Sequence, residues 1–508
     1  MTDRSTSKPG VSRRTMLLGS AAAAAVAGGG GYLLGRSESP PVQESAAAPS
    51  PAAAKYRSRP DLNGLPDVTI TTPGRGTAPG HVFLTPFAGA LRGPLIVDEK
   101  GSPVWFRKVP DPATVAIDFK AQRYRGKPVL TWWEGTIGGT GGQGVGQGEF
   151  VVVDQAYREI TRIRAAGTEQ ADQHDLLITA EGTALFWVYD PVPYDLTSLG
   201  GPADGVLHDG VLQEIDIATG RLILEWRARD HVGLDESYAP LPQGASAHLP
   251  YDYLHPNSVS LDADGHLLFS ARHTWGLYKV HRRTGAVLWR IGGKRSDLRV
   301  DERSAFSWQH DFQRRRDGGY SIFDNGAGIT TERDYSRGLI FSVDEKARTV
   351  TFVAEHVHPQ RLSAPTQGNF RELADGGTFI GWGQQPHFTE HDADGTVRLA
   401  GHLPRDNQSY RAYKAEWAGV ARDQPALGLR VEGDSVIASA SWNGHTGVAR
   451  WRARAGGRPG ALSTAVEAER AGFETELTLA GVPEYVVVDA LDETGQVIGS
   501  SSAIPVRV

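Results

Sequence analysis

The chain has 508 residues, of which 22% are charged and 40% hydrophobic, and its formal net charge is -6. A chain of this length exceeds what one small core uses, so at least two structural units are expected. The negative charge gives no electrostatic reason to bind nucleic acid, and the lack of cysteine excludes disulfides, thiolate nucleophiles, zinc–thiolate sites and a lipid-anchored lipoprotein.

Residues 1–37 read as a targeting segment. Arg13 and Arg14 precede an apolar run that starts at Met16, and paired arginines before a mildly hydrophobic run resemble a twin-arginine (Tat) export signal. The resemblance implies export of the folded protein by the Tat machinery to an extracellular, cell-envelope or periplasmic location. The alternative is an ordinary membrane anchor, because residues 16–34 could span a bilayer. An uncleaved segment would associate with the membrane.

Residues 38–60 are rich in proline, alanine and serine and are predicted to form a disordered linker. The motif "GTGGQG" at 139–144 matches a dinucleotide-binding pattern, but a strand pattern follows it where a helix is required. We therefore expect a loop between strands there and no cofactor.

From residue 61 a hydrophobic strand, a short turn and a second strand recur six times, with "LIVDEKGSPVWF" and "FSVDEKARTVTFV" as two of the copies. The turns begin near Asp98, Asp154, Asp216, His281, Asp344 and Asp392. Between the copies lie further hairpin patterns such as "HPNSVSLDADGHLLFSARH". Two hairpins per repeat make a four-stranded sheet, and such sheets bury their faces when they form a ring. The sequence predicts an all-β fold with a six-bladed β-propeller over 61–422; stacked sandwiches are the alternative.

Residues 423–508 contain short alternating strands with frequent turns. This pattern is typical of an immunoglobulin or fibronectin-III-like β-sandwich. Trp442 and Trp451 are predicted to lie in its core.

Three histidines occupy the same place in successive repeats. His174, His255 and His310 each stand where the strand leading into the second hairpin begins. The innermost strands of a propeller line its channel, so these imidazoles are expected to meet at one polar, solvated mouth and to titrate near neutral pH. The alternative is that each histidine hydrogen-bonds the next blade. The following histidines are interpreted as loop or surface residues: His208, His231, His248, His266, His281, His356, His358, His387, His391, His402 and His445.

Arg272 ends the strand after the one that His255 opens, so it can reach the same mouth. Three histidines alone could bind zinc. An arginine beside them favours an anionic substrate, because its charge repels a metal ion. No metal is expected, although Asp172, Asp175 and Asp311 leave a calcium cage open as an alternative.

Several phrases together resemble the arylsulfotransferase family, whose bacterial members do not use the nucleotide donor PAPS. They include "DYLHPNSV", "SARHTWGLYKV", "LWRIGGKRSD", "FSWQHDFQ" and "SIFDNG", and the likeness covers about residues 75–415. It implies a six-bladed propeller that moves a sulfuryl group from an aryl sulfate donor to a phenolic acceptor through a transiently sulfated histidine. Carried over by motif, His310 is the nucleophile, and the other catalytic residues are His255, Arg272 and His174. The residues predicted to bind substrate are Asn257, His273, Trp308, Asn325 and Tyr253.

The chemistry suits these residue types. Neutral imidazole is a fair nucleophile, Arg272 can fork onto two sulfate oxygens, and the other histidines can act as acid and base. Asp311 or a backbone carbonyl is expected to fix the tautomer of His310, and the attacking nitrogen stays open. The alternative function is a non-enzymatic exported propeller that binds an anionic aromatic ligand or a cell-envelope partner. A metal-dependent hydrolase is a third reading.

Overall fold

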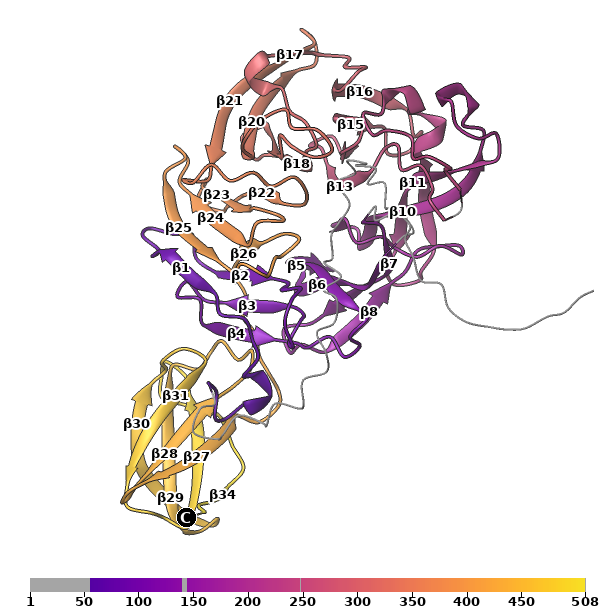
Figure 1. Ribbon diagram of the computed structural model, residues 1–508. Helices are drawn as coiled ribbons and strands as arrows, with labels where there is room; N and C mark the ends of the chain where they lie inside the picture. The colour runs from indigo at the N-terminus through magenta and orange to yellow at the C-terminus, as the bar shows by residue number, and fades with distance from the viewer. Residues whose placement is uncertain (1–54, 139–143, 247, 508) are drawn as a thin grey trace, which may run out of the picture.

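The structure is a computed structural model that describes residues 55–138, 144–246 and 248–507 (Figure 1). The predicted targeting segment at 1–37 and the linker as far as residue 54 lie outside the described residues, as do residues 139–143 of the glycine motif. Within the described ranges no helix has the length and apolar character needed to cross a bilayer. The helices described are single 3₁₀ turns: η2 (Pro60–Leu62), η3 (Thr197–Leu199), η4 (Ala228–Asp230), η5 (Leu234–Glu236) and η6 (Glu302–Ser304).

Six sheets of four or five strands occupy residues 69–415, and all their pairings are antiparallel except that of β17 with β21. The first sheet contains β26 (Tyr413–Ala415), β2 (His81–Leu84), β3 (Leu95–Val97) and β4 (Pro103–Phe106). The second contains β5 (Val115–Tyr124), β6 (Lys127–Ile137), β7 (Gly146–Val153) and β8 (Glu159–Ile163). The third contains β9 (Leu176–Ile178), β10 (Thr183–Tyr194), β11 (Gly205–Asp216) and β12 (Leu222–Arg227). The fourth sheet contains β13 (Pro256–Leu261), β14 (Leu267–Ala271), β15 (Gly276–Val280) and β16 (Val287–Gly292). The fifth contains β18 (His310–Arg314), β19 (Tyr320–Asp324), β20 (Arg337–Asp344), β21 (Thr349–Val357) and β17 (Arg299–Val300). The sixth contains β22 (Asn369–Glu372), β23 (Thr378–Gly381), β24 (His387–His391), β25 (Val397–His402) and β1 (Thr69–Thr72).

The six repeated phrases form the outer hairpin of each sheet, as the sequence predicts. Five of these turns begin with an aspartate and one with His281. The Oδ1 atom of Asp98 accepts the backbone N–H groups of Lys100 and Ser102, both at 2.9 Å, and Oδ1 of Asp216 accepts that of Thr219 at 2.9 Å. An aspartate that bonds the backbone just ahead of it specifies a tight turn locally.

The sheets stand side by side around a ring (Figure 1). Their innermost strands touch in sequence: β5 contacts β9, β9 contacts β13, β13 contacts β18, and β18 contacts β22. Strand β26 contacts both β23 and β5 and so completes the circle. The N-terminal strand β1 pairs with β25, and the late strand β26 pairs with β2. The ring is thus closed by strands from both ends of the segment.

The C-terminal residues form two further sheets. The first contains β27 (Ala426–Glu432), β28 (Ser435–Ser441) and β31 (Glu474–Ala480), and the second contains β30 (Ala461–Glu469), β29 (Arg450–Arg458), β32 (Tyr485–Leu491), β33 (Val497–Ser500) and β34 (Ile504–Pro505). One hydrophobic cluster joins them, and Trp442 and Trp451 belong to it, as predicted.

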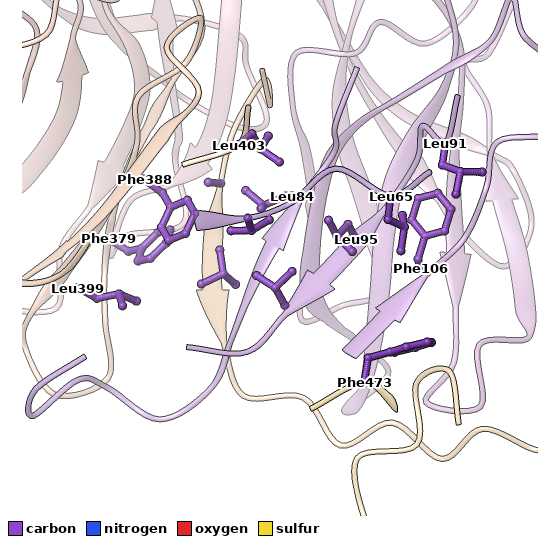
Figure 2. Packing of buried hydrophobic residues seen from close by; sticks show 14 of the residues in the cluster. Leu65, Leu84, Leu91, Leu95, Phe106, Phe379, Phe388, Leu399, Leu403 and Phe473 are labelled. Atoms are coloured by element: carbon purple, nitrogen blue, oxygen red, sulfur yellow. The ribbon is translucent and has the colours of Figure 1, made fainter. Parts of the chain in front are cut away.

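The last residues of the predicted linker, 55–60, are ordered and contact the rest of the protein. Tyr56 is buried, and its ring lies 4.9 Å from that of Phe473 in an edge-on contact. The backbone N–H of Ser58 donates to the Glu474 carboxylate at 2.6 Å. Tyr56 and Phe473 join a core cluster that extends through the ring to Phe388 (Figure 2). Composition does not reveal these contacts, because they are made with residues far along the chain, such as Phe473 and Glu474.

Candidate active site

The innermost strands that carry the predicted site are irregular where they begin. The pairing register shifts between Pro256 and Ser258 and between His310 and Gln313. Such bulges re-aim side chains. His255 and the neighbour of His310, Asp311, adopt φ values of 51° and 59°, which are uncommon outside glycine. Strain of this kind is held by the surrounding fold and concentrates at functional sites.

The structure brings His174, His255 and His273 into direct contact. The ring centroids of His174 and His255 lie 4.8 Å apart, and those of His255 and His273 lie 4.6 Å apart. His310 joins this group through the segment at 365–367, because Arg272 donates to the Pro365 carbonyl at 3.1 Å and the Gln367 N–H donates to Nε2 of His310 at 3.2 Å. Arg272, His174 and His255 also lower the pKa of His310. Residues far apart in the chain therefore meet at one place in the ring.

His310 is fixed by two neighbours. Its Nδ1 atom lies 2.8 Å from Oδ1 of Asn325, whose own amide nitrogen donates to the carbonyl groups of Ala364 and Gln367. Oδ1 of Asn325 is therefore the acceptor, and Nδ1 of His310 carries the proton. The backbone N–H of Gln367 donates to Nε2 at 3.2 Å, which leaves the lone pair on Nε2.

This arrangement corrects one expectation. Asp311 was expected to fix the tautomer of His310, but its carboxylate accepts the Phe370 backbone N–H at 2.9 Å and pairs with Arg371 at 2.6 Å. Asn325, predicted to bind substrate, is the residue that orients His310. A chain neighbour on a strand points to the opposite face, so Asp311 was the weaker candidate.

His174 and His255 are each held by an aspartate that the sequence analysis did not assign to them. Asp172 accepts the backbone N–H of His174 at 2.9 Å and contacts its Nδ1. Asp252 accepts the backbone N–H of His255 at 3.0 Å and contacts its Nδ1. The spacings Asp-Xaa-His and Asp-Xaa-Xaa-His were visible in "DQHD" and "DYLH", and this local pairing could have been found there.

Arg272 packs among aromatic groups at the centre of the site. Its Nη1 lies 3.0 Å from Nε2 of His273, its Nη2 donates to the carbonyl of Pro365 at 3.1 Å, and its guanidinium lies 5.0 Å from the centre of the Trp308 ring. His273 is itself held through Nδ1, which donates to the Asp252 carbonyl at 2.6 Å. The guanidinium is thereby oriented by three contacts before any anion arrives.

The site is drier than the sequence predicts. His310 is 2% exposed, His255 6% and Arg272 5%. Burial lowers the pKa of His310 well below its usual range, and Arg272 adds to the effect. Burial, with His174 and Arg272, does the same to the pKa of His255, and burial lowers the pKa of His273 to about 3. The expectation of solvated imidazoles that titrate near neutral pH is therefore wrong for these groups.

Two predicted substrate-binding residues lie in the packed interior. Tyr253 is fully buried in the hydrophobic cluster between the sheets of β9–β12 and β13–β16. Asn257 donates from its amide to the Gln309 carbonyl at 2.8 Å and links β13 to the chain before β18. Four histidines interpreted as loop or surface residues are also buried: His208, His356, His358 and His391.

An aromatic stack borders the site. Tyr238 lies parallel to Trp275 with ring centres 3.7 Å apart, and Trp275 meets Trp308 edge-on at 5.3 Å. The ammonium group of Lys294 lies 4.8 Å from the centre of the Tyr238 ring. Trp275 and Trp308 both have positive φ, 48° and 57°, so backbone strain again accompanies the site.

One group of described residues has the spacing of metal ligands. Ligand atoms of Asp252, His255 and His273 lie within 4.8 Å of one another. These atoms already hydrogen-bond within the group, and the Arg272 cation adjoins His273. We therefore do not assign a metal to them.

The calcium cage considered from the sequence does not form in the described part of the chain. Asp175 pairs with Lys120 at 2.6 Å and with Arg411 at 3.0 Å. Asp311 pairs with Arg371, and Asp172 holds His174. Each carboxylate therefore has a partner that would compete with a cation.

Comparison with known proteins gives one family. The model described as arylsulfotransferase (ASST) matches residues 120–403, more than half of the chain. No curated protein matches.

Solved structures align over much of the chain at low similarity. A protein of unknown function from Bacteroides caccae has 11% identity, covers 66% of this chain and 98% of its own, and gives a TM-score of 0.41. A catalytically inactive virginiamycin B lyase from Staphylococcus aureus with quinupristin has 9% identity, 65% and 94% coverage, and a TM-score of 0.32. A streptogramin B lyase has 11% identity, 73% and 94% coverage, and a TM-score of 0.35. Scores this low say nothing about what this chain does.

Proposed function

Because the chain belongs to the arylsulfotransferase (ASST) family, we propose that it moves a sulfuryl group from an aryl sulfate ester to a phenolic acceptor, without PAPS, by a ping-pong reaction through sulfated His310. Family membership supports aryl sulfotransferase activity in general. The particular mechanism is supported by the tautomer of His310: a proton on Nδ1 toward Asn325 and a lone pair on Nε2.

In the first half-reaction, the lone pair of Nε2 of His310 leaves its hydrogen bond with the Gln367 N–H and attacks the sulfur of the donor. An N–S bond forms, the S–O bond to the aryl group breaks, and the departing oxygen takes a proton from a neighbouring imidazole. In the second half-reaction a phenolic oxygen attacks the same sulfur, the N–S bond breaks, and the phenol proton returns to the site. Sulfuryl transfer resembles phosphoryl transfer, in which positioning and charge stabilisation do most of the work.

Two groups are placed to stabilise the sulfuryl oxygens. Arg272 presents a planar fork to two of them. The backbone N–H of Gln367, which donates to Nε2 of His310, would face these oxygens once Nε2 bonds to sulfur. Gln367 has a φ of 67°, an uncommon conformation that aims this N–H group. Fixed donors directed at developing charge lower the barrier because they need no reorganisation.

Intact mass after mixing with an aryl sulfate donor, and no acceptor, tests the proposal. We expect a gain of one SO₃ group per chain, located on His310 by peptide mapping, and loss of that mass when a phenol is added. Donor binding with no gain in mass would favour the alternative of a non-enzymatic binding protein. Turnover that stops in a chelator would favour a metal-dependent hydrolase.

The low pKa of His310 gives the second prediction. An imidazole with an ordinary pKa of about 6.5 is half protonated when the pH equals that pKa, so only half of it can act as a neutral nucleophile. The pKa of His310 is lowered well below this value, so the neutral nucleophile persists as the pH falls. With p-nitrophenyl sulfate, the rate of the first half-reaction should therefore be unchanged between about pH 7.5 and 5.5, as measured by rapid mixing. A rate that falls by half near the ordinary histidine pKa of about 6.5 would contradict the lowered pKa of His310.

We extend the proposal to the architecture and location. The six sheets are the blades of a β-propeller over 61–422, and the C-terminal sheets are an immunoglobulin or fibronectin-III-like sandwich over 423–508. The propeller interpretation is supported by the closed circle of contacts among the inner strands, and the sandwich by its shared core. Export by the Tat machinery to an extracellular, cell-envelope or periplasmic site is supported by Arg13 and Arg14 before the apolar run.

A further inference from the structure

The three buried imidazoles share one arrangement but differ in the charge of the partner at Nδ1. His174 contacts the carboxylate of Asp172, and His255 contacts that of Asp252. His310 instead donates to the neutral amide oxygen of Asn325 at 2.8 Å. All three contacts are buried, where a difference in partner charge has a large effect because the local dielectric is low.

The difference in charge separates two chemical tasks. A carboxylate beside an imidazole favours the imidazolium form, whereas an amide orients the ring and leaves it neutral. A nucleophile must be neutral, and a group that protonates a departing phenolate must carry a proton. We propose that Asp252 acts as a positioning residue that lets His255 carry the proton to the leaving phenolate, while Asn325 keeps His310 neutral for attack. This inference rests on the proposed sulfotransferase function.

His255 is better placed for this task than His174. His174 is 1% exposed and lies 5.9 Å from the ring of Tyr410, while Tyr189 lies near both imidazoles, at 5.6 Å from His174 and 5.8 Å from His255. Asp172 also accepts the backbone N–H of Gly146 at 2.8 Å, so its charge is partly used elsewhere. His255 is more exposed, at 6%, and stacks on His273.

Other groups around His255 influence whether its imidazole is protonated. The charged and titratable side chains that face it are Asp252, His174, His208, His273, Arg272 and Tyr189. Burial, His174, Arg272 and His208 oppose the imidazolium and hold the pKa of His255 well below its usual range, while the carboxylate of Asp252 at its Nδ1 favours it. The negative sulfate of a bound donor would add to the effect of Asp252. His255 can take the phenol proton released in the second half-reaction and deliver a proton to the leaving oxygen when the next donor binds, so that protons balance over the cycle.

The test is the leaving-group dependence of the first half-reaction in Asp252→Asn. Phenyl sulfate releases a poor leaving group that needs a proton, and p-nitrophenyl sulfate releases a good one that does not. Loss of general acid catalysis typically costs about 10²-fold or more. We expect a loss of that size with phenyl sulfate and a much smaller one with p-nitrophenyl sulfate, measured as phenol released per enzyme after rapid mixing.

Asp172→Asn is the matched variant, because it makes the same change beside the neighbouring imidazole. A steeper leaving-group dependence in Asp172→Asn alone would transfer the role to His174 and overturn the inference. Equal losses with both donors in Asp252→Asn would mean that Asp252 has only a structural role, and this result would also overturn the inference. The proposed function would still stand if the wild-type protein became sulfated. If Asp252→Asn does not fold, His255→Gln should give the same donor-selective loss. A wild-type protein that no donor sulfates would overturn both proposals.

Discussion

Replacing His310 with alanine is expected to abolish sulfuryl transfer. Nε2 of His310 is the atom that forms the N–S bond in the proposed mechanism, and no other described group is held by Asn325 and the Gln367 N–H in the same way. Removing a nucleophile costs far more than removing a positioning group, so turnover with p-nitrophenyl sulfate and a phenol should fall by about 10⁴-fold or more. The measurement is steady-state release of p-nitrophenol together with intact mass after donor alone, which should show no added SO₃.

His356→Ala is a matched control, because it also removes a buried imidazole and shows how much activity is lost through effects on folding alone. His356 is also 2% exposed and holds one hydrogen bond through Nδ1, to Thr378 at 2.7 Å. It lies on β21, where its ring stacks on that of His391 of β24, outside the candidate site. Its variant should retain sulfation of the protein. If His310→Ala kept sulfation, or if both variants lost it equally, His310 would not be the nucleophile.

The hairpins could be predicted because their causes are local. An aspartate such as Asp98 or Asp216 bonds the backbone a few residues ahead, and the residues that do so lie within one turn. The alternation on each side then fixes the strands. The meeting of His174 and His255 follows from repetition, since equivalent strands of neighbouring sheets converge around one axis.

The partners that define the chemistry could not be predicted in the same way. Asn325 directly follows the end of β19, and Gln367 comes from the loop before β22. Their contacts depend on the bulge at Asp311 and on positive φ values, which the amino-acid types do not reveal. Burial was missed for a related reason: the mouth of a ring is solvated only where no side chains fill it, and here Trp308 packs beneath Arg272.

Replacing Arg272 with glutamine is expected to slow the reaction and to shift its pH dependence. The guanidinium is the cation assigned to the sulfate in the proposed mechanism, and loss of one fixed donor to developing charge typically costs about 10²–10³-fold in rate. Arg272 also lowers the pKa of His310. Without this cation the pKa of His310 rises, so the nucleophile becomes protonated at a higher pH than in the wild-type protein. The rate of the first half-reaction should therefore begin to fall at a higher pH as the solution is acidified.

Arg272→Lys separates the two effects of the guanidinium. Lysine keeps the positive charge but cannot form the two-pronged contact with sulfate or the flat contact with Trp308. It should therefore lose rate while the pH dependence stays close to that of the wild-type protein, provided that its ammonium group occupies the same place. Rapid-mixing rates across the pH range for both variants give the comparison. A slower Arg272→Gln variant with an unchanged pH profile would mean that the guanidinium does not act on His310, and a variant with the wild-type rate would remove Arg272 from the site.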